Sequence, residues 1–140
     1  MISSDNPRGY IELAHTADWA VKIWAMDYFD LLRIAAEAMY SLQMVEIDRR
    51  EPGIPIEFLV QDEDEEITLV GFLSELLYHQ DTHFIALDNF IIEMQQAGIR
   101  VCAVWFPIIR IEKEIKAVTY SGLKVQHFPQ GIEAIVVFDV

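Results

Sequence analysis

Two segments of the chain carry a large apolar side chain at every second position. They are residues 19–25 (WAVKIWA) and residues 54–60 (IPIEFLV). Successive side chains of a β-strand point to opposite faces of a sheet, so this two-residue period is typical of a strand with one buried face. The pattern therefore predicts two strands, each with one side in a hydrophobic core.

The segment that follows each of these strands has the longer period of an amphipathic helix. In residues 28–43 and 67–80 apolar side chains recur three or four positions apart. Asp27 is a good N-cap for the first helix. The second helix is preceded by the acidic run QDEDEE at 61–66. We interpret this run as a favourable helix N-terminus, because consecutive carboxylates on a solvated turn splay apart and make a poor metal site.

The rest of the chain is predicted to be mainly β-structure. Apolar runs separated by glycine and proline, which favour turns, lie at about 84–95, 99–106, 115–127 and 132–139. Together these elements predict an α+β fold: a single domain over residues 1–140, with a mainly antiparallel sheet of about six strands and two α-helices packed on it.

The charge of the chain restricts its partners. Ten basic residues against 23 acidic residues give a net charge of −13. An acidic surface repels phosphate backbones, so no strong direct nucleic-acid binding is expected, and a cation or a basic protein is the better partner. No apolar run approaches the roughly 18 residues that span a membrane, so no membrane contact is expected.

The cysteine content and the first residues predict a cytoplasmic location. The single cysteine, Cys102, lies within the apolar run VCAVWF and is predicted to be a core residue. With one cysteine no internal disulfide can form, which fits a reducing compartment. The segment MISSDNPRGY lacks the basic and apolar regions of a signal peptide.

Two histidines have a spacing that is used in metal sites. His79 and His83 are four residues apart, as zinc ligands are on one face of a helix. This geometry requires the second helix to continue through His83, whereas Asp81 and Thr82 are predicted to end it. A zinc site is therefore not expected here, and nothing in the sequence places a pair of carboxylates for hydrolysis.

The last segment, IEAIVVFDV, has a carboxylate at the end of an apolar strand. Asp139 shares a face with Ile135 and Val137, and the α-carboxylate of Val140 lies beside it. Two neighbouring negative charges must be exposed to solvent or neutralised by a cation. The residues alone leave both interpretations open: a solvated end, or one half of a cation site.

The sequence resembles the archease family in four blocks and, more weakly, in FLSELLY at 72–78. The blocks are HTADWAVKIWA at 15–25, LLRIAAEAMYSL at 31–42, EIKAVTYSGLKV at 114–125 and VVFDV at 136–140. The resemblance implies a divalent cation, Ca²⁺ or alternatively Mg²⁺, bound by Asp18, Asp139 and the terminal carboxylate of Val140. Such a hard cation takes about 6–8 oxygen ligands, for which carboxylates are suitable donors.

The same resemblance gives roles to neighbouring residues. His15 is expected to orient Asp18 or to contact a partner rather than to bind the metal. Lys116, Thr119 and Tyr120 match the family and are candidate site-support or partner-facing residues. For Thr119 and Tyr120 ordinary strand packing is the alternative.

The resemblance implies an accessory protein rather than an enzyme. Archeases are associated with the RtcB-type RNA-splicing ligase, which joins tRNA halves; they promote its guanylylation and its multiple turnover. The alternative is a chaperone-like module for another RNA-processing enzyme, such as a tRNA methyltransferase, and a third is a stand-alone metal-dependent hydrolase. Two departures favour a different client: the shortened segment 107–114, and Ser121 where the family commonly has histidine.

Overall fold

The computed structural model describes residues 6–13 and 19–140 of the chain. Its elements are, in chain order, β1 (Gly9–Leu13), β2 (Trp19–Ala25), α1 (Tyr28–Leu42), β3 (Glu46–Ile47), β4 (Ile54–Val60), α2 (Glu65–His83), β5 (Ile85–Gln95), β6 (Gly98–Arg110), β7 (Ala117–Thr119), β8 (Gln126–Phe128) and β9 (Gly131–Asp139). The two segments with a two-residue period are the strands β2 and β4, with the predicted bounds.

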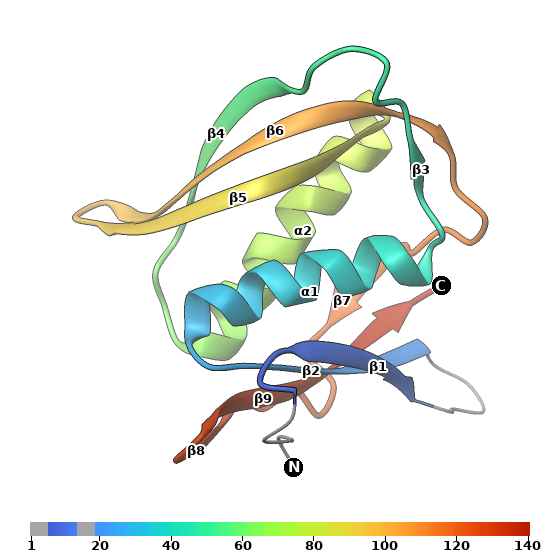
Figure 1. Ribbon diagram of the computed structural model, residues 1–140. Helices are drawn as coiled ribbons and strands as arrows, with labels where there is room; N and C mark the ends of the chain where they lie inside the picture. Colours follow the sequence, from blue (N-terminus) through green and yellow to red (C-terminus); the bar gives the residue numbers. More distant parts are fainter. Residues whose placement is uncertain (1–5, 14–18) are drawn as a thin grey trace.

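The strands of the described residues form two antiparallel sheets. The first has the order β1-β2-β9-β7, and β8 also pairs with β9. In the second sheet, β6 pairs with β4 and β5 along its length and with β3 near its C-terminal end. Figure 1 shows both helices between the two sheets. The α+β class with antiparallel strands and two helices is therefore confirmed for the described part of the chain.

The division into two sheets differs from the single sheet of about six strands that the sequence predicted. The physical reason lies in α2, whose buried residues are spread around the helix: Thr68, Leu69, Val70, Phe72, Leu73, Leu76, Leu77 and Gln80. A helix that is apolar on several sides must be covered on several sides, and one sheet covers only one. No helix in the described ranges combines the length and the apolar character needed to cross a membrane.

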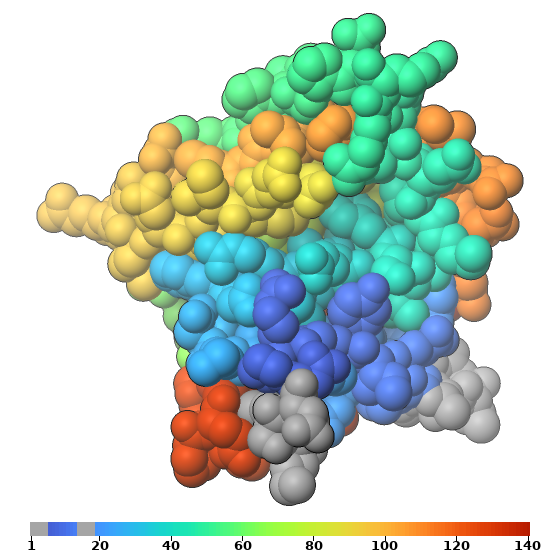
Figure 2. All heavy atoms as spheres, in the orientation of Figure 1, coloured from blue at the N-terminus to red at the C-terminus, as the bar shows by residue number. Residues whose placement is uncertain are grey.

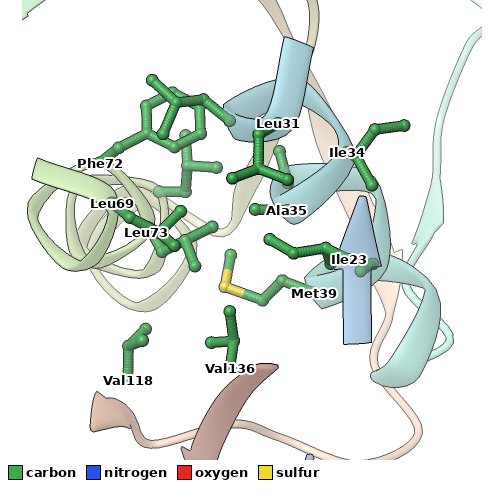
Figure 3. Close-up of a cluster of buried hydrophobic side chains, with 14 of the residues drawn as sticks. Ile23, Leu31, Ile34, Ala35, Met39, Leu69, Phe72, Leu73, Val118 and Val136 are labelled. Carbon is green, nitrogen blue, oxygen red and sulfur yellow. The ribbon is translucent and has the colours of Figure 1, made fainter. Parts of the chain in front are cut away.

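The core surrounds the two helices and includes buried residues of both sheets, among them Val136 of β9 and Val101 of β6. Figure 3 shows Met39 of α1 between Leu73 of α2 and Val136 of β9. All three side chains are fully buried. Burying side chains of this size contributes about 1.5–3 kcal/mol each, so this contact fixes the central strand β9 against both helices.

Both helices begin as the sequence predicts. The carboxylate of Asp27 accepts a hydrogen bond from the Asp30 N–H at 2.8 Å, and that of Asp64 accepts one from the Ile67 N–H at 2.9 Å. These bonds satisfy backbone donors that a helix N-terminus leaves free. The acidic run at 61–66 is thus a helix start: it supplies the N-cap and the acidic residues of the first turn.

The predicted end of α2 is wrong. Asp81 and Thr82 are helical, and the helix continues to His83 before Phe84 adopts a left-handed conformation with φ 54° and donates its N–H to the Gln80 carbonyl at 3.0 Å. Aspartate and threonine disfavour a helix by at most about 0.7 kcal/mol each. The burial of Gln80, which is 1% exposed, outweighs this preference.

The prediction that Cys102 is a core residue is also wrong. It is only partly buried, on the face of β6 that points away from the helices, and its Sγ lies 3.8 Å from Glu57 Oε2. On β6 the alternate residues Val101 and Ala103 face the core. The β5–β6 hairpin that carries these residues projects from the side of the molecule (Figure 2).

Candidate functional site

The C-terminal end of β9 carries one of the predicted metal ligands. β9 pairs with β2 on one side and with β7 on the other, so Phe138 lies opposite Trp19 and Asp139 lies opposite Ala117. The Asp139 side chain is exposed, on the face of the sheet that points away from the helices, because its neighbour Phe138 is buried against them. Its carboxylate is therefore available to a ligand from solvent.

Val140 follows β9 and is half-buried. Its side chain packs against the hydrophobic core. The carbonyl of Asp139 accepts a hydrogen bond from the Lys116 N–H at 2.8 Å, so the backbone just before Val140 is held in place by the strand beside it. The backbone of Val140 is consequently held at the end of β9, beside the segment that leads into β7.

The other half of the predicted site lies outside the described residues. His15 and Asp18 belong to the range 14–18, and the structure does not test their assignment. Trp19, which follows Asp18 in the chain, is described and is held firmly. Its indole N–H donates to Glu12 Oε2 at 2.7 Å, and the Lys113 ammonium lies 4.7 Å from the centre of its ring.

Of the three remaining predicted residues, Thr119 lies in β7, while Lys116 and Tyr120 flank this strand. Lys116 precedes this strand, is exposed, and contacts the site through its backbone N–H. Thr119 pairs with Val137, two residues before Asp139, and its hydroxyl accepts a hydrogen bond from the Ser121 N–H at 3.2 Å. Tyr120 is 58% exposed. The structure therefore brings Lys116 to the end of β9, while Thr119 and Tyr120 lie farther along the neighbouring strand.

A buried pair of glutamines fixes the segment that leads into β7. The amide nitrogens of Gln43 and Gln80 donate to each other's amide oxygens at 3.0 and 2.7 Å. The Gln43 amide oxygen also accepts from the Ile115 N–H at 2.9 Å, and its main-chain oxygen accepts from the Glu112 N–H at 3.0 Å. Residues 112–115 are thus tied to both helices just before Lys116 meets Asp139.

The same segment brings together two acidic residues that the sequence analysis did not connect. Burial raises the pKa of the Asp81 carboxyl, and the neighbouring charge of Glu114 raises it further, with a hydrogen bond between the two side chains adding to the effect. Asp81 lies in the last turn of α2 and Glu114 follows β6. Only the three-dimensional fold brings these two residues together, so no pattern in the sequence could have revealed the pair.

Within the described ranges, no three acidic, histidine or cysteine side chains lie close enough together to hold a metal ion. At the end of β9 the described residues contribute the carboxylate of Asp139 and the main chain of Val140. Oxygen donors of this kind suit a hard cation such as Ca²⁺ or Mg²⁺ rather than a soft one. The donor set fits the predicted ion, and further oxygens are needed to complete its shell.

Comparison with known proteins gives consistent matches over almost the whole chain. The model of the Archease protein family matches residues 10–140. The archease of Archaeoglobus fulgidus is 32% identical over 138 residues, covering 94% of this chain and 98% of its own. The archease of Methanosarcina barkeri is 29% identical over 146 residues, covering 98% of this chain and 99% of its own.

Two solved structures share the fold. A crystal structure from Thermotoga maritima, described as an archease and a possible chaperone, has a TM-score of 0.70 at 23% identity and covers 91% of this chain and 94% of its own. The solution structure of protein 1598 from Methanobacterium thermoautotrophicum has a TM-score of 0.68 at 22% identity, with 94% and 99% covered. At these identities the likeness shows the fold.

Proposed function

We propose that this chain, which belongs to the archease family, is an accessory protein that holds a divalent cation and activates an RtcB-type RNA-splicing ligase. The proposed ion is Ca²⁺, with Mg²⁺ as the alternative. The proposed ligands are the carboxylates of Asp18 and Asp139 and the terminal carboxylate of Val140. The observation that carries the proposal is the pairing of Trp19 with Phe138 in the first sheet.

This pairing supports a shared site, because it joins the strand that follows Asp18 in the chain to the strand that carries Asp139. β2 and β9 are antiparallel, so Trp19, the first residue of β2, lies opposite Phe138 near the end of β9. Asp139 follows Phe138 directly. Consecutive Cα atoms are only about 3.8 Å apart, which is compatible with one ion shared by the two proposed carboxylates.

The charges at the end of β9 support a cation. Two or three carboxylates at one place are costly unless they are exposed or neutralised, and a Ca²⁺ ion takes about 6–8 oxygens, which carboxylates, main-chain carbonyls and water can supply. When bound, the ion would supply a fixed positive charge that a partner protein can recognise.

Metal binding is tested by calorimetry with Ca²⁺. Asp139→Asn keeps the size of the side chain and removes its charge, so we expect a loss of at least tenfold in affinity with the fold preserved. Asp18→Ala should abolish binding. Asp62→Asn, an exposed aspartate on the acidic run, is the matched control and should bind as the unchanged chain does. Equal affinity for Asp139→Asn and Asp62→Asn would refute the assignment.

Ligase activation is tested by multiple-turnover joining of tRNA halves. We expect the cognate ligase to complete more turnovers, and to form more of its guanylated intermediate, in the presence of this chain. Asp139→Asn should lose this effect and Asp62→Asn should keep it. No change in ligation with the unchanged chain would count against the proposed activation even if Ca²⁺ binds.

A second candidate function is a chaperone-like interaction with another RNA-processing enzyme, such as a tRNA methyltransferase. The feature that favours it is the short connection after β6, which ends at Arg110 and leaves six residues before β7. Recovery of a methyltransferase without a ligase on the immobilised chain would favour this function. Turnover of phosphoesters by the purified protein would instead indicate a stand-alone hydrolase.

A further inference from the structure

We propose that His79 and His83 form a second metal site, open on one side, that binds a first-row transition-metal dication such as Ni²⁺, Cu²⁺ or Zn²⁺. The site lies on the last turns of α2 and shares no ligand with the oxygen site proposed at the end of β9. It takes a different class of ion, because imidazole nitrogens favour these metals, whereas carboxylates and carbonyls favour Ca²⁺ and Mg²⁺.

The continuous helix gives the two histidines the required geometry. Because α2 runs through His83, residues four apart lie one above the other on the same face. The ring centres of His79 and His83 are 5.9 Å apart, and the rings are inclined by 31°. A tetrahedral ion that holds two imidazole nitrogens at about 2.0–2.1 Å brings the ring centres to about 5 Å. Metal binding therefore requires the side chains to rotate so that the ring centres approach by about 1 Å.

One ring nitrogen of His79 has no hydrogen-bond partner among the described residues. The Nε2 of His79 faces Glu75, with 3.6 Å between Nε2 and Glu75 Oε1. Its Nδ1 is buried and has no hydrogen-bond partner among the described residues. A carboxylate behind one nitrogen with an unshared lone pair on the other is the arrangement in which histidines usually bind metals. Glu75 is thus a positioning residue.

The space beside the pair has room for an ion and its remaining ligands. His79 and His83 line a hollow of about 430 Å³ whose other walls are mostly apolar, and which includes Phe84 and Trp105. The hollow lies at the C-terminal end of α2, where the helix dipole favours positive charge. Because the described residues place no third acidic, histidine or cysteine ligand here, the remaining coordination positions are open to water or to a donor from another molecule.

The test is a Ni²⁺ titration of the untagged chain by calorimetry, in excess Mg²⁺ so that carboxylates are already occupied by a hard ion. We expect one Ni²⁺ per chain. His83→Gln and His79→Gln should each weaken binding at least tenfold, and Glu75→Gln should weaken it less. His127→Gln is the matched control, because this exposed histidine has Glu65 as its neighbour at 2.6 Å and should leave Ni²⁺ affinity unchanged.

Two results would overturn the proposal. One is unchanged Ni²⁺ affinity in His83→Gln, whose side chain is exposed, so that its replacement leaves the fold intact. The other is an equal loss in His127→Gln, which would indicate scattered surface binding. Asp139→Asn distinguishes the two sites, because it should lower Ca²⁺ affinity and leave Ni²⁺ affinity unchanged. Failure of one proposed site would therefore not count against the other.

Discussion

Replacing Gln43 by methionine should destabilise the fold strongly, although the two side chains have similar size. Gln43 is fully buried and Gln80 is 1% exposed. Gln43→Met removes the partner of three buried polar groups: both ends of the Gln80 amide and the N–H of Ile115. Leaving a buried polar group unpaired costs about 1–3 kcal/mol. The lower half of that range gives a loss of about 3–6 kcal/mol in the free energy of unfolding.

The same contacts predict that the two single changes are not equivalent. After Gln80→Met, the Gln43 amide keeps its bonds to the Met39 carbonyl at 3.3 Å and to the Ile115 N–H. No group is left without a partner, so the expected loss is only about 1–2 kcal/mol. In the double variant only the Ile115 N–H is unpaired. The double variant should therefore be more stable than Gln43→Met alone.

Urea unfolding followed by circular dichroism measures these differences, with unchanged m-values as the check that each variant unfolds from a comparable state. A double-mutant cycle then isolates the coupling between the two glutamines, which we expect to be at least about 2 kcal/mol. Simple addition of the two single losses in the double variant would show that the two glutamines are not coupled and would refute the predicted difference. Gln43→Met should also weaken Ca²⁺ binding, because it releases residues 112–115 beside the end of β9.

Three further changes test separate parts of the structure. Asp81→Asn should stabilise the protein at neutral pH: the pKa of Asp81 is raised above its ordinary 3.8 in the fold, so ionisation costs stability as pH rises through the folded pKa. The gain in the free energy of unfolding should be below about 1 kcal/mol, because the side chain is largely exposed. Urea unfolding well below pH 3.8 should show no gain. An equal gain at every pH would contradict the raised pKa of Asp81. Asp64→Ala removes the N-cap of α2 and should cost about 1 kcal/mol in urea unfolding, whereas an unchanged midpoint would show that the cap contributes nothing. Extending the chain beyond Val140 turns the terminal carboxylate into an amide and should weaken Ca²⁺ binding in calorimetry; undiminished affinity would exclude that group as a ligand.

The spacing of apolar residues along the chain was sufficient to predict several of the strands and helices. The bounds of β2 and β4 and the first residue of α1 follow from apolar spacing and capping residues, which act over a few positions. The end of α2 and the two-residue strand β3 do not. The end of α2 depends on Gln80 meeting Gln43, which is 37 residues away in the chain, and no local preference encodes such a contact.

For the candidate sites too, some residues could be identified from the sequence and others could not be tested or were misjudged. Asp139 could be singled out because a carboxylate that closes an apolar strand is unusual in any sequence. Its side chain is exposed in the structure, and its role as a ligand stays a prediction. His15 and Asp18 lie outside the described residues, and the metal, the ligase and the cytoplasmic location stay predictions. The spacing of His79 and His83 was visible in the sequence, and only the wrong helix end argued against a metal there.

Because β9 holds the first sheet together and also carries Asp139, a chain that lacks β9 loses its fold and a proposed metal ligand at the same time. β9 is bonded on both sides, to a strand more than 100 residues earlier and to strands just before it. A copy cut before residue 131 would leave β2, β7 and β8 without their partner strand, and unpaired strand edges promote aggregation. A chain that has lost this segment is therefore expected to aggregate rather than to persist as a folded protein without Asp139, the carboxylate on which the proposed calcium site depends.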